Sequence, residues 1–434
     1  MLKNMLQKII FRYIIFTASL LFTLYFISDC ASLKPRPMTP ELWHNDLHYF
    51  STELPKRHYN LFKQISREQF QQSVSALDDK IPTLSDTEIA VEFACIAAMI
   101  GGGHTEVSLT RRIPGYGRIP LKLYYFGDSL YVVAASQSYT KLLGARVLRI
   151  GNISVSDAFK TVVPLLSHDN EMEFIDSAPR YLVCPAILHS LKIIPQKERA
   201  VFLLQSLNGE KFTLDLRPVP YSQLQNLEWV NAWEYFAKSS PLYLQHPEKH
   251  YWYIYLKDSK TLYFKYDVCN NQNGQKSIKW FSDEMFSFVD THPIERFVID
   301  LRDNSGGNYH RSKPIIEGIV NRPSINKKGK LFVIIGRRTY SAALITAIEL
   351  KRKTEALFVG ERSRGKPNGQ EDVKHFRLPN SLIEVDYAVK SHILIPKLGD
   401  NPYFPLNIIV KQSARDYFAG RDAVLEKILS IENN

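Results

Sequence analysis

Three apolar runs in the C-terminal half of this 434-residue chain constrain its fold more than any other feature. They are Phe297 to Leu301, Leu331 to Ile335 and Ala356 to Val359, and each has the length of one buried strand. A loop of polar and glycine residues follows each run directly. Because the carboxyl ends of parallel strands meet at one edge of an open α/β sheet, the three loops are predicted to meet there.

These loops contain a hydroxyl, an amine and unshielded backbone N–H groups, a combination that serine hydrolases use. The first contains Gly306 and Gly307, whose unshielded backbone N–H groups could hold an oxyanion. The second leads to Ser341, which is either a helix N-cap or a nucleophile, and the amide of Ala342 would then be another oxyanion donor. The third contains Lys366, which is either a solvated surface lysine or a desolvated general base.

A histidine offers a second candidate base. His104 follows three consecutive glycines and is either a structural histidine or a base that reaches Ser341 across the fold. In the latter case a carboxylate must orient its other ring nitrogen. Asp400 is one candidate for that place.

Composition excludes several other classes of protein. The chain is 45% hydrophobic and 23% charged, as globular proteins are, and its net charge of +11 is dispersed without a dense basic run, so no nucleic-acid partner is expected. Its four cysteines lie far apart, so no metal site and no disulfide framework is indicated. Cys95, Cys184 and Cys269 are interpreted as core residues, and no cofactor is expected.

The first thirty residues have the pattern of an export signal. Three basic residues within the first twelve positions precede an uncharged apolar run from Tyr13 to Ile27. Cys30 follows, and residues 27–30 resemble a loose bacterial lipoprotein cleavage box, which predicts lipidation of Cys30. An uncleaved anchor, or cleavage without lipid, are the alternatives. Residues 1–30 are therefore expected to be a signal or membrane anchor of an exported protein, periplasmic or on the cell surface and tethered to the membrane.

The rest of the chain divides into four segments. Residues 31–40 contain three prolines and are predicted to be a tether, and residues 41–110 show helical periodicity. Residues 119–219 contain short strands and turns, interrupted by one helix from Ser156 to about Leu166. Within them, Leu143 to Asn152 resembles the strand and turn of a PDZ domain, although a plain small β-domain is an equal interpretation. Strands and helices alternate over residues 229–434, which predicts an α/β domain.

Four places in the sequence together resemble the tail-specific, or C-terminal-processing, serine peptidases and their tricorn-core relatives. Phe297 to Gly307 is similar to their D-L-R-x-N-x-G-G oxyanion loop, and Thr339 to Ala343 to their nucleophile motif. Val359 to Lys366 resembles their V-G-E-x-x-x-G-K segment, and Gln370 falls where the family has a glutamine that supports the lysine. Gly103-His104-Thr105 resembles the G-D-G-H-T segment of one branch. The resemblance extends from about Ala94 to the C-terminus.

The resemblance implies an α/β multidomain protein with a helical N-terminal segment, a PDZ-like β-domain and a catalytic domain of the ClpP/crotonase type. It implies a serine endopeptidase that cleaves peptides or protein C-terminal tails. Ser341 would be the nucleophile. Lys366 is the expected base, supported by Gln370. In the rival arrangement, His104 is the base and Asp400 orients it. A non-proteolytic protein that binds apolar ligands or peptides on the same fold is the alternative function. The sequence leaves the oligomeric state open.

Overall fold

A computed structural model describes residues 37–109, 116–237, 240–274 and 276–432. The predicted signal or anchor, Cys30 and most of the tether lie outside the described residues. Within the described part of the chain, no helix combines the length and the apolar character needed to cross a membrane.

The N-terminal segment is helical, as predicted. It contains α2 (Pro40–Arg57), α3 (Arg67–Lys80) and α4 (Asp86–Met99). Capping boxes fix the starts of α3 and α4, because Ser66 and Ser85 each accept a hydrogen bond from a backbone N–H of the first turn. The segment then ends in a short strand, β1 (Glu106–Val107), which the sequence did not predict.

The second segment is a small β-domain of short strands, as predicted. Its main sheet has the order β10-β4-β5-β7-β8, with β3 and β6 paired at its sides. β2 and β9 pair with each other in a separate two-stranded sheet. The strands of the whole domain are β2 (Gly117–Arg118), β3 (Leu121–Phe126), β4 (Ser129–Ser136), β5 (Arg146–Ile150), β6 (Ile153–Ser154), β7 (Ala200–Gln205), β8 (Lys211–Leu216), β9 (Val219–Pro220) and β10 (Trp229–Asn231).

Helices cover this sheet more extensively than the sequence indicated. The predicted helix corresponds to α5, whereas α6 and α7 were not predicted. Pro179 lies inside α6, where proline is unfavourable, and Pro185 is the first residue of α7, where proline is tolerated. The helices of this part of the chain are α5 (Val155–Val162), α6 (Glu171–Tyr181), α7 (Pro185–Ser190), α8 (Tyr221–Leu224) and α9 (Ala232–Phe236).

A six-stranded sheet forms the centre of the third segment, in the order β11-β12-β13-β14-β15-β18. From β12 to β18 the neighbouring strands are parallel, as predicted for the three apolar runs, and β11 is antiparallel to β12. The strands are β11 (Tyr251–Leu256), β12 (Thr261–Tyr266), β13 (Arg296–Asp300), β14 (Leu331–Ile335), β15 (Leu357–Gly360) and β18 (Ile408–Ile409).

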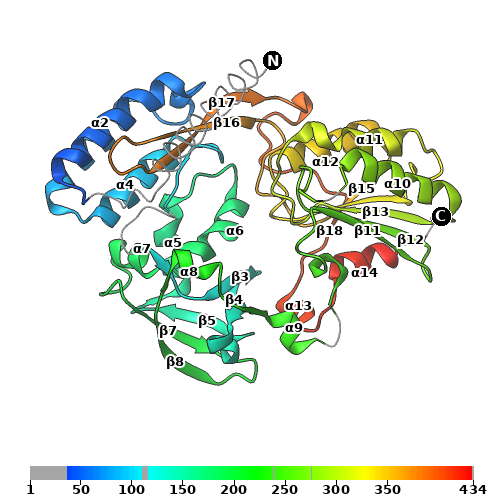
Figure 1. Cartoon of the computed structure of the whole chain (residues 1–434), viewed down its shortest axis with the longest axis horizontal. Helices are drawn as coiled ribbons and strands as arrows, with labels where there is room; N and C mark the ends of the chain where they lie inside the picture. Colours follow the sequence, from blue (N-terminus) through cyan, green and yellow to red (C-terminus); the bar gives the residue numbers. More distant parts are fainter. Residues whose placement is uncertain (1–36, 110–115, 238–239, 275, 433–434) are drawn as a thin grey trace, which may run out of the picture.

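Helices cover both faces of this sheet, so its central strands are buried on both sides (Figure 1). One face packs against α10 (Ile278–Thr291), α11 (Lys313–Val320) and α12 (Ala342–Lys353). The other packs against α14 (Ala423–Leu429), and α13 (Ala414–Phe418) precedes it in the chain. The expected α/β multidomain class, with N-terminal helices, a small β-domain and a C-terminal α/β domain, is confirmed.

A long hairpin leaves the α/β domain and joins the N-terminal helices (Figure 1). It consists of β16 (Gln370–Arg377) and β17 (Glu384–His392), and β17 also pairs with β1. The side chains of Phe376, Leu378, Val385 and Tyr387 are buried in the same core cluster as α2 and α4. The hairpin therefore packs on the N-terminal helices, although it belongs to residues 229–434 in the sequence.

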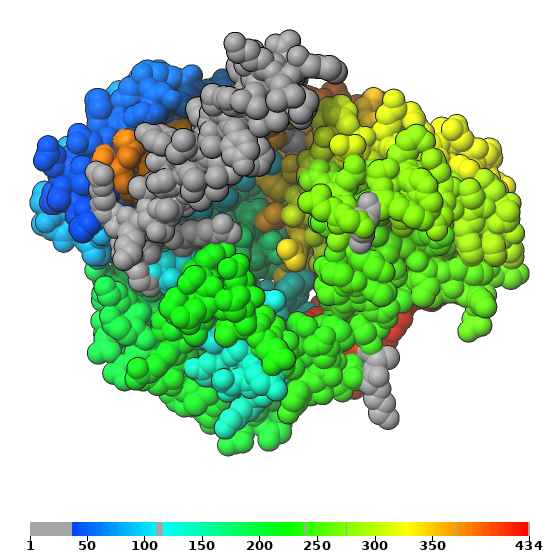
Figure 2. Space-filling view, viewed as in Figure 1, coloured from blue at the N-terminus to red at the C-terminus, as the bar shows by residue number. Residues whose placement is uncertain are grey.

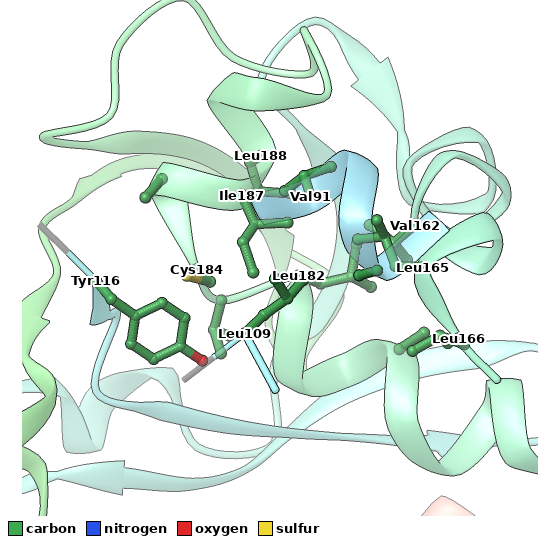
Figure 3. Close-up of a cluster of buried hydrophobic side chains, with 14 of the residues drawn as sticks. Val91, Leu109, Tyr116, Val162, Leu165, Leu166, Leu182, Cys184, Ile187 and Leu188 are labelled. Atoms are coloured by element: carbon green, nitrogen blue, oxygen red, sulfur yellow. The ribbon is translucent and has the colours of Figure 1, made fainter. Parts of the chain in front are cut away.

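The two N-terminal segments share one hydrophobic core. Figure 3 shows Val91 of α4 beside Ile187 and Leu188 of α7, with Val162 of α5 close by. Cys184 is fully buried in this cluster, and Cys269 is fully buried in the α/β domain, as predicted, whereas Cys95 is partly exposed. In Figure 2 the blue N-terminal helices, the green and cyan β-domain and the yellow-green α/β domain form three adjoining lobes.

Candidate active site

The loops after β13, β14 and β15 lie at one edge of the central sheet, because these three strands are parallel neighbours. The loop after β13 contains Gly306 and Gly307, the loop after β14 leads to Ser341, and the loop after β15 leads to Lys366. Tyr340 N donates to the backbone oxygen of Asn304 at 3.1 Å, which joins the first two loops. The arrangement predicted for the three loops is confirmed.

Ser341 adopts a backbone conformation that is unusual for a residue with a side chain. Its φ is 49° and its ψ is −125°, directly before the first residue of α12. Its side chain makes no capping hydrogen bond, unlike those of Ser66 and Ser85, which begin α3 and α4 with negative φ. Such strain at a strand-to-helix turn is typical of nucleophile elbows, which project the hydroxyl out of the turn. The N-cap interpretation of Ser341 therefore does not fit the geometry.

The glycine loop packs directly against this serine. A Cβ atom on Gly306, whose φ is 114°, would lie 2.9 Å from Ser341 Cβ and 3.1 Å from Ala342 N. Only glycine fits there. The N–H of Gly306 already donates to Asn304 Oδ1 at 2.9 Å, so the amides that remain for an oxyanion are those of Gly307 and Ala342.

His104 lies in a buried environment next to the residue that precedes Ser341. Its Nδ1 is 2.8 Å from the hydroxyl of Tyr340, and the two rings are stacked with centroids 4.6 Å apart. A Cβ on Gly103 would lie 2.2 Å from that hydroxyl, which explains the glycine before the histidine. Burial, and then the charge of Arg364, lowers the pKa of His104 to about 4, so the imidazole is neutral at pH 7. Its Nε2 is buried and has no hydrogen-bond partner among the described residues.

The carboxylate beside His104 belongs to Glu371, which the sequence did not single out. Glu371 Oε2 is 3.7 Å from His104 Nδ1, and Oε1 accepts a hydrogen bond from the Tyr59 hydroxyl at 3.0 Å. Burial, and then the negative charge of Asp169, raises the pKa of Glu371 to about 7. Asp400, the expected carboxylate, is exposed in the turn after Pro396–Leu398. The only signal for Glu371 in the sequence is its place next to Gln370.

Lys366 reaches the same buried cluster from the other side. Its Nζ lies 3.7 Å from Asp169 Oδ1, which also accepts a hydrogen bond from Gly103 N at 3.2 Å. Its side chain is 19% exposed, and a Cβ on Gly369 would lie 2.8 Å from Lys366 Cε. Burial raises the pKa of Asp169, and the charge of Lys366 opposes that rise. Gln370 is the first residue of β16.

The structure thus brings together both predicted bases and two unpredicted carboxylates. We refer to His104, Asp169, Tyr340, Lys366 and Glu371 as the His104 cluster. Its members come from all three lobes and from the edge of the central sheet that carries Ser341. The cluster can accept a proton from a hydroxyl at that edge and can stabilise the resulting positive charge.

Comparison with known proteins identifies one family. Residues 312–388, which include Ser341, Lys366 and Glu371, match the model of peptidase family S41. No curated protein matches the chain.

Solved structures reproduce the fold over most of the chain. The structure of mature CPAF complexed with lactacystin aligns with a TM-score of 0.63 at 14% identity, over 90% of this chain and 98% of that one. Mature CPAF in a second structure aligns with a TM-score of 0.61 at 14% identity, over 90% and 96% of the two chains. At this identity the likeness concerns the fold.

Proposed function

We propose that this chain, whose residues 312–388 match the model of peptidase family S41, is a serine endopeptidase of that family with Ser341 as its nucleophile. The observation that carries the proposal is the strained backbone of Ser341, with φ of 49°, at the start of α12 and against Gly306. A surface serine or an ordinary cap has no need of that conformation. The substrate class is peptides or protein tails.

The reaction follows from the positions of these groups. Ser341 Oγ attacks the carbonyl carbon of the scissile bond while its proton passes to a base, and the carbonyl oxygen becomes an oxyanion held by the amides of Gly307 and Ala342. The base then protonates the departing amine, which leaves an acyl-enzyme. Water activated by the same base hydrolyses the ester and releases Ser341.

His104 is the base that the electrostatics favour. Its imidazole is neutral at pH 7, because burial lowers its pKa, and Nε2 is unpartnered among the described residues. The carboxylate of Glu371 stabilises the imidazolium that forms when the proton arrives. Lys366 is the second candidate, because the Asp169 carboxylate and the Gly103 amide connect it to the same cluster.

Active-site labelling separates the two bases. The rate of fluorophosphonate labelling of Ser341 is measured in His104→Ala and Lys366→Ala, with Lys374→Ala as the matched control because Lys374 is exposed on β16. Loss of labelling in His104→Ala alone supports the assignment. Loss in Lys366→Ala alone transfers the role of base to the lysine.

We also propose that the enzyme acts outside the cytoplasm while tethered to the membrane. The support is the basic start and apolar run of residues 1–27, followed by Cys30. Growth with a radiolabelled fatty acid should label the wild type and leave Cys30→Ala unlabelled. A protein recovered wholly in the cytoplasmic fraction would refute export. An unlabelled wild type in the membrane fraction would show that the anchor carries no lipid.

A further inference from the structure

A large cavity lies between the β-domain and the edge of the central sheet that carries Ser341. Its volume is about 780 Å³, within the range of ligand-binding pockets. On one side it is lined by residues of β3 and β4, which lie nearer the centre of the molecule than β7 and β8 (Figure 1). On the other it is lined by the loops that follow β13, β14 and β15.

Two residues that line this cavity lie close in sequence to the proposed active site, one in the loop after β13 and one in the loop after β14. Ser305, which lines it, directly precedes Gly306, and Arg338, which also lines it, lies three residues before Ser341. In a peptide whose scissile bond lies at Ser341, the residues on one side of that bond therefore pass the mouth of the cavity.

Most of the charged side chains that line the cavity are already neutralised. Arg302 donates to both carboxylate oxygens of Asp422 at 3.0 and 2.9 Å, and Arg337 donates to Glu361 at 3.0 and 3.1 Å. Arg364 likewise pairs with acidic residues of α6. These pairs support the walls and leave no net charge to recruit a ligand.

Four basic residues of the lining form no ion pair among the described residues. Arg118 donates to the Tyr116 hydroxyl and Arg180 to Ser177, which leaves Lys122 and Arg338. Lys122 on β3 has its Nζ 4.7 Å from the centre of the Trp229 ring, and Arg338 lines the same cavity from the loop after β14. Neither forms an ion pair with a carboxylate among the described residues. Burial, and then the positive charge of Arg338, lowers the pKa of Lys122, so the two cations are close enough to repel each other. The positive charge of Arg338 also acts on the Asp303 carboxylate, whose pKa it helps to lower, but that carboxylate is bound by Lys265 at 2.9 Å.

Two unneutralised cations on opposite walls of one cavity are suited to an anion between them. We propose that the cavity is a specificity site for acidic side chains, in which Lys122 and Arg338 bind an aspartate or glutamate of the substrate close to the scissile bond. The proposal rests on the proposed peptidase function and names its substrate class. The apolar part of the same wall, which includes Leu123 and Trp229, contacts the stem of that side chain.

Binding to an inactive variant tests the site without requiring cleavage. Ser341→Ala is titrated into fluorescein-labelled decapeptides that carry either one central glutamate or a glutamine in its place, each made with a free and an amidated C-terminus. We expect the glutamate peptide to bind on the order of tenfold more tightly, with a preference that weakens as salt rises. Adding Lys122→Ala and Arg338→Ala should remove the preference, and Lys211→Ala, exposed on β8, should keep it.

The outcomes distinguish this proposal from the peptidase function. Equal binding of the two peptides, or a preference that depends on the free C-terminus alone, would overturn the acidic-side-chain site. Arg338→Glu should reverse the preference toward a lysine peptide, and an unchanged preference in that variant also refutes the site. Failure of the wild type to cleave a glutamate peptide that it binds would count against the peptidase and not against the site.

Discussion

The hydroxyl of Tyr340 lies 2.8 Å from Nδ1 of His104, although 236 positions separate the two residues. Tyr340 is also the neighbour of Ser341, so one side chain connects the nucleophile's turn to the proposed base. The stacked rings restrict how far His104 can move. In the tautomer whose Nδ1–H donates to the Tyr340 hydroxyl, Nε2 is the nitrogen that can take a proton.

Tyr340→Phe tests this connection. The ring that packs on His104 remains, so the far-UV circular dichroism should not change, whereas loss of the hydroxyl leaves Nδ1 without its closest partner. We expect Ser341 to be labelled about tenfold more slowly, which corresponds to the loss of one buried hydrogen bond. The measurement is the second-order rate of fluorophosphonate labelling, and Tyr139→Phe in the β-domain is the control. A rate equal to that of the wild type would remove Tyr340 from the mechanism.

Gly306→Ala tests the contact between the glycine loop and the nucleophile. The new Cβ would lie 2.9 Å from Ser341 Cβ and must displace it, so labelling should slow by roughly a hundredfold. Gly329→Ala is the matched control, because Gly329 also has a positive φ, of 83°, but no atom within 4 Å of the added Cβ. If both variants lose the same activity, backbone strain and not the contact is responsible.

The pH dependence of labelling tests the role of Glu371. Burial raises the pKa of its carboxyl to about 7, and only the ionised form stabilises an imidazolium on His104. Labelling should therefore increase as the pH rises through about 7. Glu371→Gln has no ionisable group at this position, so its labelling should be slower and should lack this increase. A variant that keeps the same pH profile would assign the increase to another group.

Ionisation of the same carboxyl, which is expected to speed labelling, is expected to lower the stability of the fold. Its pKa is raised from an ordinary 4.5 to about 7 in the folded protein, so its contribution to stability is complete below pH 4.5 and is lost as the pH rises through about 7. The ionised form costs on the order of 3 kcal/mol of unfolding free energy above that range. Glu371→Gln should therefore unfold at a higher temperature than the wild type at pH 8.5 and at a similar one at pH 4.5. Calorimetry at both values checks this, and a destabilised variant at pH 8.5 contradicts it.

Asp46→Ala tests how the N-terminal helices hold the hairpin that begins after Lys366. Asp46 is fully buried in α2, and its carboxylate accepts hydrogen bonds from Asn380 N, Asn380 Nδ2 and Ser381 N at 2.9, 2.9 and 2.8 Å. Its removal leaves these donors unsatisfied and should lower the unfolding free energy by about 3 kcal/mol. Urea unfolding measures this, with Asp78→Ala as an exposed control. An unchanged midpoint would show that the hairpin is held by its apolar contacts alone.

The sequence could predict the parts of this structure that depend on local pattern. The runs at 297–301, 331–335 and 356–359 became parallel neighbours, because their apolar residues and the loops after them carry the signal of buried strands. Strand β16 was missed, because its sequence QEDVKHFR is charged and has the pattern of a loop. In the structure, β17 and the N-terminal core cover its apolar side.

The acid beside the base was missed for a different reason. Glu371 meets His104 only through the pairing of β17 with both β16 and β1, which no spacing in the sequence encodes. Asp400 was one candidate for this carboxylate, and the fold leaves it exposed in a turn. Contacts between residues hundreds of positions apart depend on the packing of the three lobes.

Intact-mass measurement of the full chain after incubation with a fluorophosphonate tests the central claim most directly. The account predicts a single adduct on the wild type, located on Ser341 by peptide mapping, and no adduct on a folded Ser341→Ala protein. A folded wild type that stays unlabelled at every pH from 5 to 9, or an adduct that persists in Ser341→Ala, would contradict it.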